Sequence, residues 1–281
     1  MRVGASLDMG WLADLDGVRR AAITFDEAGV DFLTTSGHLL TAREGRYPGF
    51  PPATYSLPYR DPFVLFAHLA AVTNRLRFRT AILILPLFPT VLVAKQAADL
   101  SLLSGGRFEL GVGISWQEAE YQAMGQPMRR RGSKLEEQIA VLHALWTQPL
   151  VTFSGRHHEL DEIGIGQLPA SPIPIWLGCG TKPELLGRVA RIADGWMPGG
   201  GLASPEAAAA LQELATSGGR AGEVGVCGRV MAGGSVEEML DRARGQVAYG
   251  ATELVVGAPP GSSIADGVEA IAQARRHLEA L

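Results

Sequence analysis

The sequence predicts an α/β protein with a parallel sheet, closed into a (β/α)8 TIM barrel. Strand-like and helix-like segments alternate along the whole chain, as in proteins with parallel sheets. Several strand-like runs carry too few polar residues for a sheet with one face in water, so both faces should be covered. Eight strand candidates fit into 281 residues, which favours a barrel over an open doubly wound sheet.

We expect one domain over residues 1–281 and take the elements in order. Asp61 before Pro62 predicts a capped helix start, and capping boxes are expected at 133–136, 181–184 and 235–238. Apolar spacing predicts a helix over 91–103, which the following Gly105 and Gly106 would end. The expected strands are 3–7, 31–35, 76–85, 108–112, 173–178, 195–197, 224–231 and 253–256.

Two insertions exceed ordinary loop length. Residues 38–60 follow the second strand, and residues 150–172 precede the fifth. The first insertion should lie on the face where barrel active sites form. The second contains a hairpin-like stretch with adjacent His157 and His158, whose side chains would point to opposite sides of a strand. A metal shared by these two histidines is therefore not expected.

Composition excludes several classes of function. A net charge of −4 gives no basic excess for binding nucleic acid. The most apolar run, 82–87, is far too short to span a membrane, and no signal peptide is recognised at the N-terminus. Cys179 and Cys227 are too few for a disulfide framework or zinc cluster and fit a reducing compartment. We expect a cytoplasmic protein without a metal site.

His38 is the first candidate catalytic residue. It lies just beyond the second strand, at the carboxyl end where a barrel exposes functional side chains. An imidazole can exchange a proton near neutral pH, although a lone histidine after a strand more often has a structural role. Spacing alone leaves both roles open.

Two glycine-containing segments could approach a ligand closely. Gly111 and Gly113 end the fourth strand, where absent Cβ atoms would admit a flat ring or a phosphate, or merely allow tight packing. Residues 178–181 lead from the fifth strand into a helix, where free N–H groups can bind an anion. A tight turn capped by Thr181 is the alternative, and Cys179 within it has no evident basic partner.

Longer passages resemble the bacterial luciferase-like monooxygenase superfamily, specifically its deazaflavin-dependent oxidoreductase branch. They cover roughly the first two thirds of the chain and together form a specific signal. They are LPYRDPF at 57–63, ILPLFPTVLVAKQAADLSLLSGGRFELGVGISWQEAEY at 84–121, RRGSKLEEQIAVLHALW at 130–146, PIPIWLGCG at 172–180 and ARIADGWMP at 190–198.

The resemblance implies a (β/α)8 barrel that holds a flavin-type ring at the carboxyl ends of its strands. It places a bulge with a non-prolyl cis peptide at Ala81-Ile82, against the ring. His38 matches a family histidine that handles protons beside the ring. The implied cofactor-binding residues are Ala81, Ile82, Gly111, Gly113, Ser115, Gly178, Cys179, Gly180 and Thr181.

The chain departs from the family pattern at three places. Gly37 replaces the acidic residue that usually precedes the histidine, which would remove a hydrogen-bonding anchor for the ring or a partner of His38. Ser115 replaces a glycine of the fourth-strand loop. Phe88-Pro89-Thr90 stands where Arg-Asn-Pro is usual. The first departure bears on both cofactor identity and catalysis.

The favoured function is hydride transfer between coenzyme F420 and a small organic substrate, with His38 as proton donor or acceptor. The alternatives are an FMN-dependent monooxygenase supplied with reduced flavin by a partner reductase, and a non-catalytic cofactor or ligand carrier. The sequence does not reveal the substrate. Relatives suggest a homodimer. Aromatic residues proposed for the substrate wall are Tyr47, Phe50, Tyr55, Tyr59 and Trp116.

Overall fold

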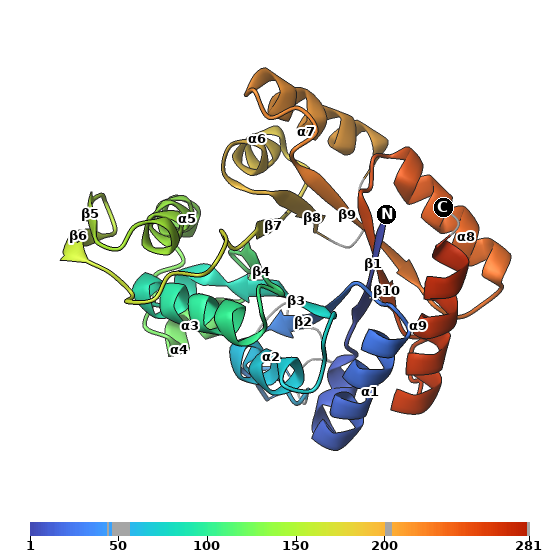
Figure 1. The fold of residues 1–281 in the computed structure, drawn as a ribbon. Coiled ribbons are helices and arrows are strands. Elements are labelled where there is room, and N and C mark those ends of the chain that lie inside the picture. The colour runs from blue at the N-terminus through green and yellow to red at the C-terminus, as the bar shows by residue number, and fades with distance from the viewer. Residues whose placement is uncertain (44, 47–56, 200–203, 280–281) are drawn as a thin grey trace.

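Eight parallel strands close into a barrel in the computed structural model, which describes residues 1–43, 45–46, 57–199 and 204–279. The ring order is β1-β10-β9-β8-β7-β4-β3-β2, and helices surround it (Figure 1). The predicted (β/α)8 barrel is confirmed, with all eight expected strands present. Their bounds are β1 (Arg2–Ser6), β2 (Phe32–Gly37), β3 (Arg77–Ile84), β4 (Phe108–Gly113), β7 (Ile175–Cys179), β8 (Gly195–Pro198), β9 (Gly225–Met231) and β10 (Glu253–Gly257).

The helices follow the strands as the alternation predicts. The expected starts at Asp61 and Ser235 are confirmed, because their side chains accept the N–H groups of Val64 and Glu238. The helices are α1 (Leu15–Glu27), α2 (Pro62–Ala70), α3 (Thr90–Leu103), α4 (Glu118–Ala123), α5 (Arg131–Thr147), α6 (Pro183–Ile192), α7 (Pro205–Ser217), α8 (Val236–Ala248) and α9 (Ile264–Leu278).

Two predicted capping boxes are wrong. Helix α5 begins two residues before Ser133, whose hydroxyl donates to the Arg130 carbonyl from within the first turn. At α6 the N-cap is Lys182 rather than Thr181, because Pro183 occupies the first helical position. The fixed φ of proline thus sets where that helix starts, in preference to the threonine before it.

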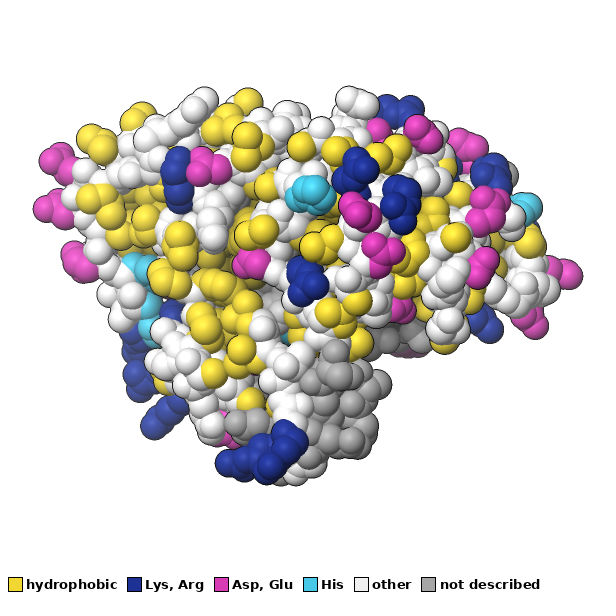
Figure 2. All heavy atoms as spheres, turned by 90° about the horizontal axis from the view of Figure 1, so that it is seen from below, with side chains coloured by type: hydrophobic (Ala, Val, Ile, Leu, Met, Phe, Trp, Pro, Cys, Tyr) yellow, Lys and Arg dark blue, Asp and Glu magenta, His cyan; other side chains and the backbone are white. Residues whose placement is uncertain are grey.

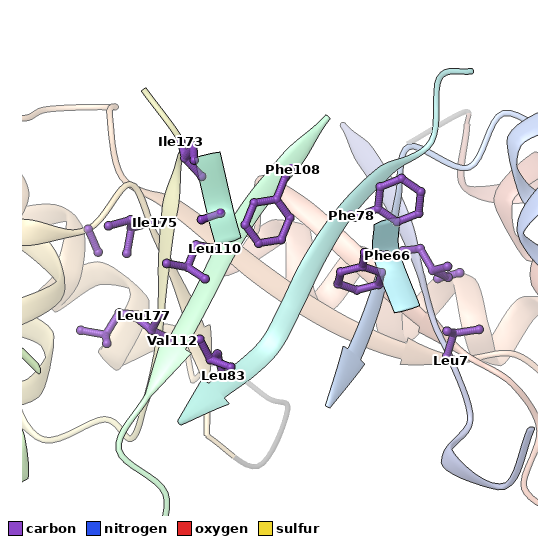
Figure 3. Close-up of a cluster of buried hydrophobic side chains, with 14 of the residues drawn as sticks. Leu7, Phe66, Phe78, Leu83, Phe108, Leu110, Val112, Ile173, Ile175 and Leu177 are labelled. Atoms are coloured by element: carbon purple, nitrogen blue, oxygen red, sulfur yellow. The ribbon is translucent and has the colours of Figure 1, made fainter. Parts of the chain in front are cut away.

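The core lies mainly between the barrel and its helices. Figure 3 shows Phe66 of α2 beside Phe78 of β3, with Phe108, Leu110 and Ile175 continuing the apolar layer along neighbouring strands. The Phe66 and Phe78 rings lie 5.2 Å apart, and both side chains are fully buried. This packing holds β3 and β4 in place beneath the site described below.

The lower interior of the barrel is charged. Arg79 of β3, fully buried, forms ion pairs with Glu109 of β4 and Glu253 of β10. Arg2 of β1 pairs with the same two carboxylates at 2.6 and 2.5 Å. These four residues come from the amino-terminal ends of their strands. They therefore form a floor at the end of the barrel opposite the expected active site.

The second insertion contains the predicted hairpin, with strands β5 (Val151–Ser154) and β6 (Glu159–Ile163) beside α5 (Figure 1). His158 Nδ1 lies 2.8 Å from Glu137, whereas His157 Nε2 lies 3.2 Å from Ser133 Oγ. The two imidazoles therefore have separate partners and fasten the hairpin to α5.

The outer surface shows no membrane-crossing element in the part of the chain that is described: no helix there has the length and apolarity required. On the face shown in Figure 2, hydrophobic side chains are exposed among charged residues of both signs. Val64 of α2 is 70% exposed and Leu103 of α3 is 73% exposed.

Candidate active site

A cavity of about 610 Å³ opens at the carboxyl ends of the barrel strands. Every barrel strand except β4 contributes to its wall, directly or through the residues that follow it. Ser6, Thr34 and Ser36 supply hydroxyl groups, and Met197 and Met231 supply apolar surface. This is the face on which TIM barrels build active sites. Its volume lies within the range of roughly 300–1,000 Å³ that small-molecule sites occupy.

The β3 bulge forms one wall of this cavity. The peptide bond between Ala81 and Ile82 is cis, which confirms the expectation from the family resemblance. The pairing of β3 with both neighbouring strands shifts register around this bond. Ala81 is exposed and Ile82 is half-buried between fully buried residues of β3, and both line the cavity. The bulge therefore offers the cavity a small, flat surface.

Glycines on neighbouring strands make room for the bulge. A Cβ at Gly178 would lie 2.6 Å from Cγ2 of Ile82, and one at Gly113 would lie 3.0 Å from its Cδ1. Gly111 packs against the Thr80 carbonyl and Met197. Gly178 lines the cavity, whereas Gly111 and Gly113 lie behind the Ile82 side chain or against the strand backbone. Tight packing, the alternative considered from sequence, thus accounts for the two glycines of β4.

Gly37 of β2 also packs closely against the β3 bulge. A Cβ there would lie 2.7 Å from the Ile82 carbonyl oxygen and 2.9 Å from Cα of Leu83, both backbone atoms of the bulged strand. Backbone atoms cannot move aside as a flexible side chain can. A side chain at position 37 would therefore require this backbone to shift.

A carboxylate nevertheless reaches His38, from a different element. Nδ1 of His38 lies 2.9 Å from Oε2 of Glu120 on α4, and Oε1 of Glu120 accepts the Leu39 N–H at 2.7 Å. The Glu120 side chain is fully buried, whereas 26% of the His38 side chain is exposed. His38 thus has an acidic partner although position 37 is glycine.

The hydrogen bond to Glu120 orients the imidazole. With Nδ1–H donated to the carboxylate, Nε2 has no hydrogen-bond partner among the described residues. Tyr59 lies nearby, with its ring centroid 5.6 Å from that of His38. His38 itself is outside the cavity lining, two residues beyond Ser36, which is part of it. The histidine thus stands at the rim with one nitrogen free.

Tyr59, Ser115 and Trp116 are not among the described residues that line the cavity. Ser115 and Trp116 follow β4, and Trp116 is 51% exposed. Tyr47, Phe50 and Tyr55 lie outside the described residues.

The segment 178–181 joins β7 to α6 at the cavity edge. The Cys179 carbonyl accepts N–H groups from Trp196 at 3.1 Å and Gly199 at 2.8 Å, which ties the segment to β8. Gly180 and Thr181 are exposed just before the helix. Burial raises the pKa of the Cys179 thiol to about 11. This thiol stays protonated near neutral pH, consistent with the packing role expected from sequence.

Sequence reasoning missed two functional candidates, Glu120 and Arg229. No short-range pattern relates Glu120 to His38, 82 positions away. Arg229 lies within β9 and lines the cavity. Its inward direction follows from strand alternation, which could have identified it. Within the described residues, no cluster of His, Cys, Asp or Glu could hold a metal ion.

The geometry fits a flavin-type ring at the bulge. Ala81 presents only a methyl group to the cavity, and the absence of Cβ atoms at Gly113 and Gly178 lets Ile82 fold back into the wall.

Curated relatives match part of the chain. An uncharacterised protein of Mycobacterium bovis is 41% identical over 162 residues, which cover 56% of either chain. An F420-dependent glucose-6-phosphate dehydrogenase of Nakamurella multipartita is 32% identical over 199 residues, covering 68% of this chain and 52% of that enzyme. The matching segments therefore span only about half the length of these relatives.

Solved structures share the fold over more of the chain. An F420-dependent secondary alcohol dehydrogenase in complex with an F420-acetone adduct matches 99% of this chain and 98% of its own, with a TM-score of 0.81 and 15% identity. A type II Baeyer-Villiger monooxygenase from Pseudomonas putida, in complex with FMN, matches 85% and 69%, with a TM-score of 0.63 and 15% identity. Enzymes that use either cofactor thus share this fold.

The family model for luciferase-like monooxygenases matches residues 2–280. That match takes in every strand of the barrel, the β3 bulge and the His38–Glu120 pair. The chain belongs to the luciferase-like monooxygenase family, whose members are oxidoreductases or monooxygenases.

Proposed function

We propose that this protein is an F420-dependent oxidoreductase, in which His38 moves a proton and Glu120 positions it. The observation that carries the proposal is the hydrogen-bonded pair of His38 and buried Glu120 at the rim of the cavity that the β3 bulge lines. The F420-dependent glucose-6-phosphate dehydrogenase, 32% identical over 199 residues, supports the choice of cofactor.

The proposed chemistry divides between cofactor and protein. Bound F420 would supply a carbon centre that accepts or donates a hydride. When an alcohol is oxidised, its carbon loses the hydride, its hydroxyl proton passes to Nε2 of His38, and a carbonyl product remains. In the reverse direction Nε2–H returns the proton to the forming hydroxyl. Throughout, Glu120 accepts Nδ1–H and keeps Nε2 available to the substrate.

The residues proposed to hold the cofactor are Ala81 and Ile82 against the ring, with Gly111 and Gly113 leaving space behind them. Segment 178–181 would meet the phosphate. We propose Tyr59 and Trp116, with Tyr47, Phe50 and Tyr55, for the substrate side.

FMN-dependent monooxygenation is the second candidate, because a fold match is an FMN-bound monooxygenase and the family model carries that name. Such an enzyme would need reduced flavin from a partner reductase.

Titration of the purified protein with F420 and with FMN separates the candidates. We expect F420 to raise the melting temperature progressively at concentrations above its Kd, by mass action. Tight FMN binding without measurable F420 binding would favour the monooxygenase instead. If neither cofactor shifts the melting temperature, the proposed site is wrong. A non-catalytic carrier would bind F420 yet show no turnover that depends on His38.

A further inference from the structure

Arg229 is a cationic residue in the cavity to which the proposed reaction assigns no role. It lies in β9, from which Cys227, Gly228, Arg229 and Met231 line the cavity. Gly228 and Val230 on either side are buried, whereas Arg229 is exposed. Because Arg229 lines the cavity, its guanidinium is accessible from the space in which a ligand would bind.

The guanidinium of Arg229 has no hydrogen-bond or ion-pair partner among the described residues. The arginines of the barrel floor differ, because Arg2 and Arg79 are both paired with Glu109 and Glu253. Asp8 is the other charged residue of the described cavity lining, and its Oδ1 accepts the Gly10 N–H at 2.8 Å. Among the described residues, Arg229 is the one cation of the lining, and it forms no ion pair with Asp8.

The surroundings of Arg229 leave it open to a ligand. A Cβ at Gly257, on the neighbouring strand β10, would lie 2.6 Å from Sδ of Met231 and 3.8 Å from Nη2 of Arg229. A side chain at position 257 would clash with Met231 and would lie in van der Waals contact with the Arg229 guanidinium, so glycine keeps this side of the guanidinium open. Because Met231 and Met197 supply apolar wall nearby, an anion that reaches the guanidinium would be partly removed from water.

The barrel topology sets Arg229 across from the proposed ring site. In the closed order of strands, β9 and β3 are separated by the same number of strands in either direction. The guanidinium of β9 and the Ala81-Ile82 bulge of β3 thus stand on opposite walls. A ligand group held by Arg229 would lie on the far side of the cavity from a ring seated at the bulge. That position suits a substrate more than the cofactor.

We propose that Arg229 binds an anionic group of the substrate, so that the substrates are organic acids or phosphate esters. A guanidinium presents parallel N–H donors that match a carboxylate or phosphate with two hydrogen bonds. That the bound anion is a substrate rests on the proposed oxidoreductase function. Anion binding by Arg229 does not depend on that function.

The test compares two probes of similar shape and different charge. Benzoate and phenyl phosphate are titrated calorimetrically against benzamide, using the protein both with and without F420. Charge-assisted hydrogen bonds correspond to about tenfold or more in affinity, so the anions should bind at least that much more tightly than benzamide. Replacing Arg229 with glutamine should remove this difference and leave benzamide binding and F420 binding within about twofold. Arg229→Lys should retain part of it.

Arg242→Gln provides the matched control, since Arg242 is exposed on α8, away from the cavity lining. This variant should keep the wild-type preference for anions. Equal binding of all three probes by the wild type would overturn the proposal. So would an R229Q protein that loses F420 affinity but keeps its preference for anions, because Arg229 would then serve the cofactor. Absence of F420 binding would overturn the proposed function alone, since titrations without cofactor still report on Arg229.

Discussion

Glu120 holds His38 through a contact between residues far apart in the sequence. One oxygen faces Nδ1 of His38 and the other accepts the backbone N–H of Leu39, so the carboxylate fixes both the ring and the loop that carries it. A buried carboxylate with both oxygens bonded keeps a single orientation. Glu120 is therefore a positioning residue, and its removal should affect His38 without touching the substrate.

Replacing His38 with alanine should lower kcat by about 10²–10⁴-fold, the usual contribution of a positioned proton donor or acceptor. Glu120→Gln should lower kcat by a smaller factor and change the pH profile of kcat, because an amide still fills the space but no longer holds the histidine as a carboxylate does. Steady-state kinetics from pH 5 to 9 with bound F420 measure both effects.

Glu118→Gln is the control for these variants, because Glu118 lies on the same helix with an exposed side chain. Its kinetics should match those of the wild type. If E120Q and E118Q have the same pH profile as the wild type, Glu120 has only a structural role. If H38A retains full turnover, another group handles the proton.

At the scale of the elements, the β3 bulge determines which side chains its neighbours can carry. Ile82 folds toward Gly113 and Gly178, and its carbonyl approaches Gly37. Three strands thus contribute glycines to one irregularity. In this backbone a side chain at position 37 would meet atoms of β3, and Glu120 of α4 supplies a carboxylate to His38.

Substituting Gly37 with alanine should destabilise the protein by about 1–3 kcal/mol, the usual cost of overpacking, because the new methyl group meets backbone atoms of β3. Gly37→Asp should be at least as damaging and should not improve turnover. Gly180→Ala is the control, since its Cβ would meet nothing closer than Leu185 Cδ1 at 4.0 Å. Denaturant unfolding measures these differences. Equal stability of G37A and G180A would show that the β3 backbone can shift to accommodate a methyl group at position 37.

The sequence predicted the barrel well because the signals for its strands and helices lie within short segments of the chain. Buried strands and helix starts such as Asp61-Pro62 depend on neighbouring residues, and these elements are present in the structure. The cis peptide at Ala81-Ile82 was predicted only through the family resemblance.

The site was predicted less completely because its contacts join distant segments. Glu120 meets His38 only once α4 packs beside the end of β2, and no periodicity reports that contact. The cap predicted at Thr181 failed for a local reason, the competing preference of Pro183 for the first helical position. Preferences for a helix start compete among residues that are neighbours in the sequence. A side-chain pair such as His38 and Glu120 forms only when the whole barrel has closed.

At the scale of the whole molecule, the barrel interior is divided along its axis. The floor holds the ion pairs of Arg2 and Arg79 with Glu109 and Glu253. The rings of Trp176 and Phe32 cover Arg79, with their centroids 3.8 and 4.4 Å from its Cζ. Above these rings lies the cavity with Arg229. Arg77 also pairs with Glu109, at 2.8 Å, so each of these floor arginines has a carboxylate partner. Arg229 has no ion-pair partner among the described residues and is available to a ligand.

The ion pairs of the floor should make the free energy of unfolding depend on pH in the acid range. Burial by itself raises the Glu109 pKa, but the charges of Arg79 and Arg2 outweigh it and lower that pKa to about 2, from 4.5. Below pH 4.5 the unfolded chain therefore takes up a proton that folded Glu109 does not bind. The free energy of unfolding should fall between pH 4.5 and 2, and the shift corresponds to about 3 kcal/mol.

Glu109→Gln tests this dependence. The variant should be less stable at pH 7, because Arg79 loses one of its carboxylate partners, and its stability should fall less steeply between pH 4.5 and 2 than that of the wild type. Urea unfolding at several pH values, followed by the fluorescence of the tryptophans, gives both quantities. Glu213→Gln, which removes an exposed carboxylate of α7, should keep the wild-type slope. An equally steep slope in E109Q would mean that other carboxylates carry the acid sensitivity and that the floor pairs do not.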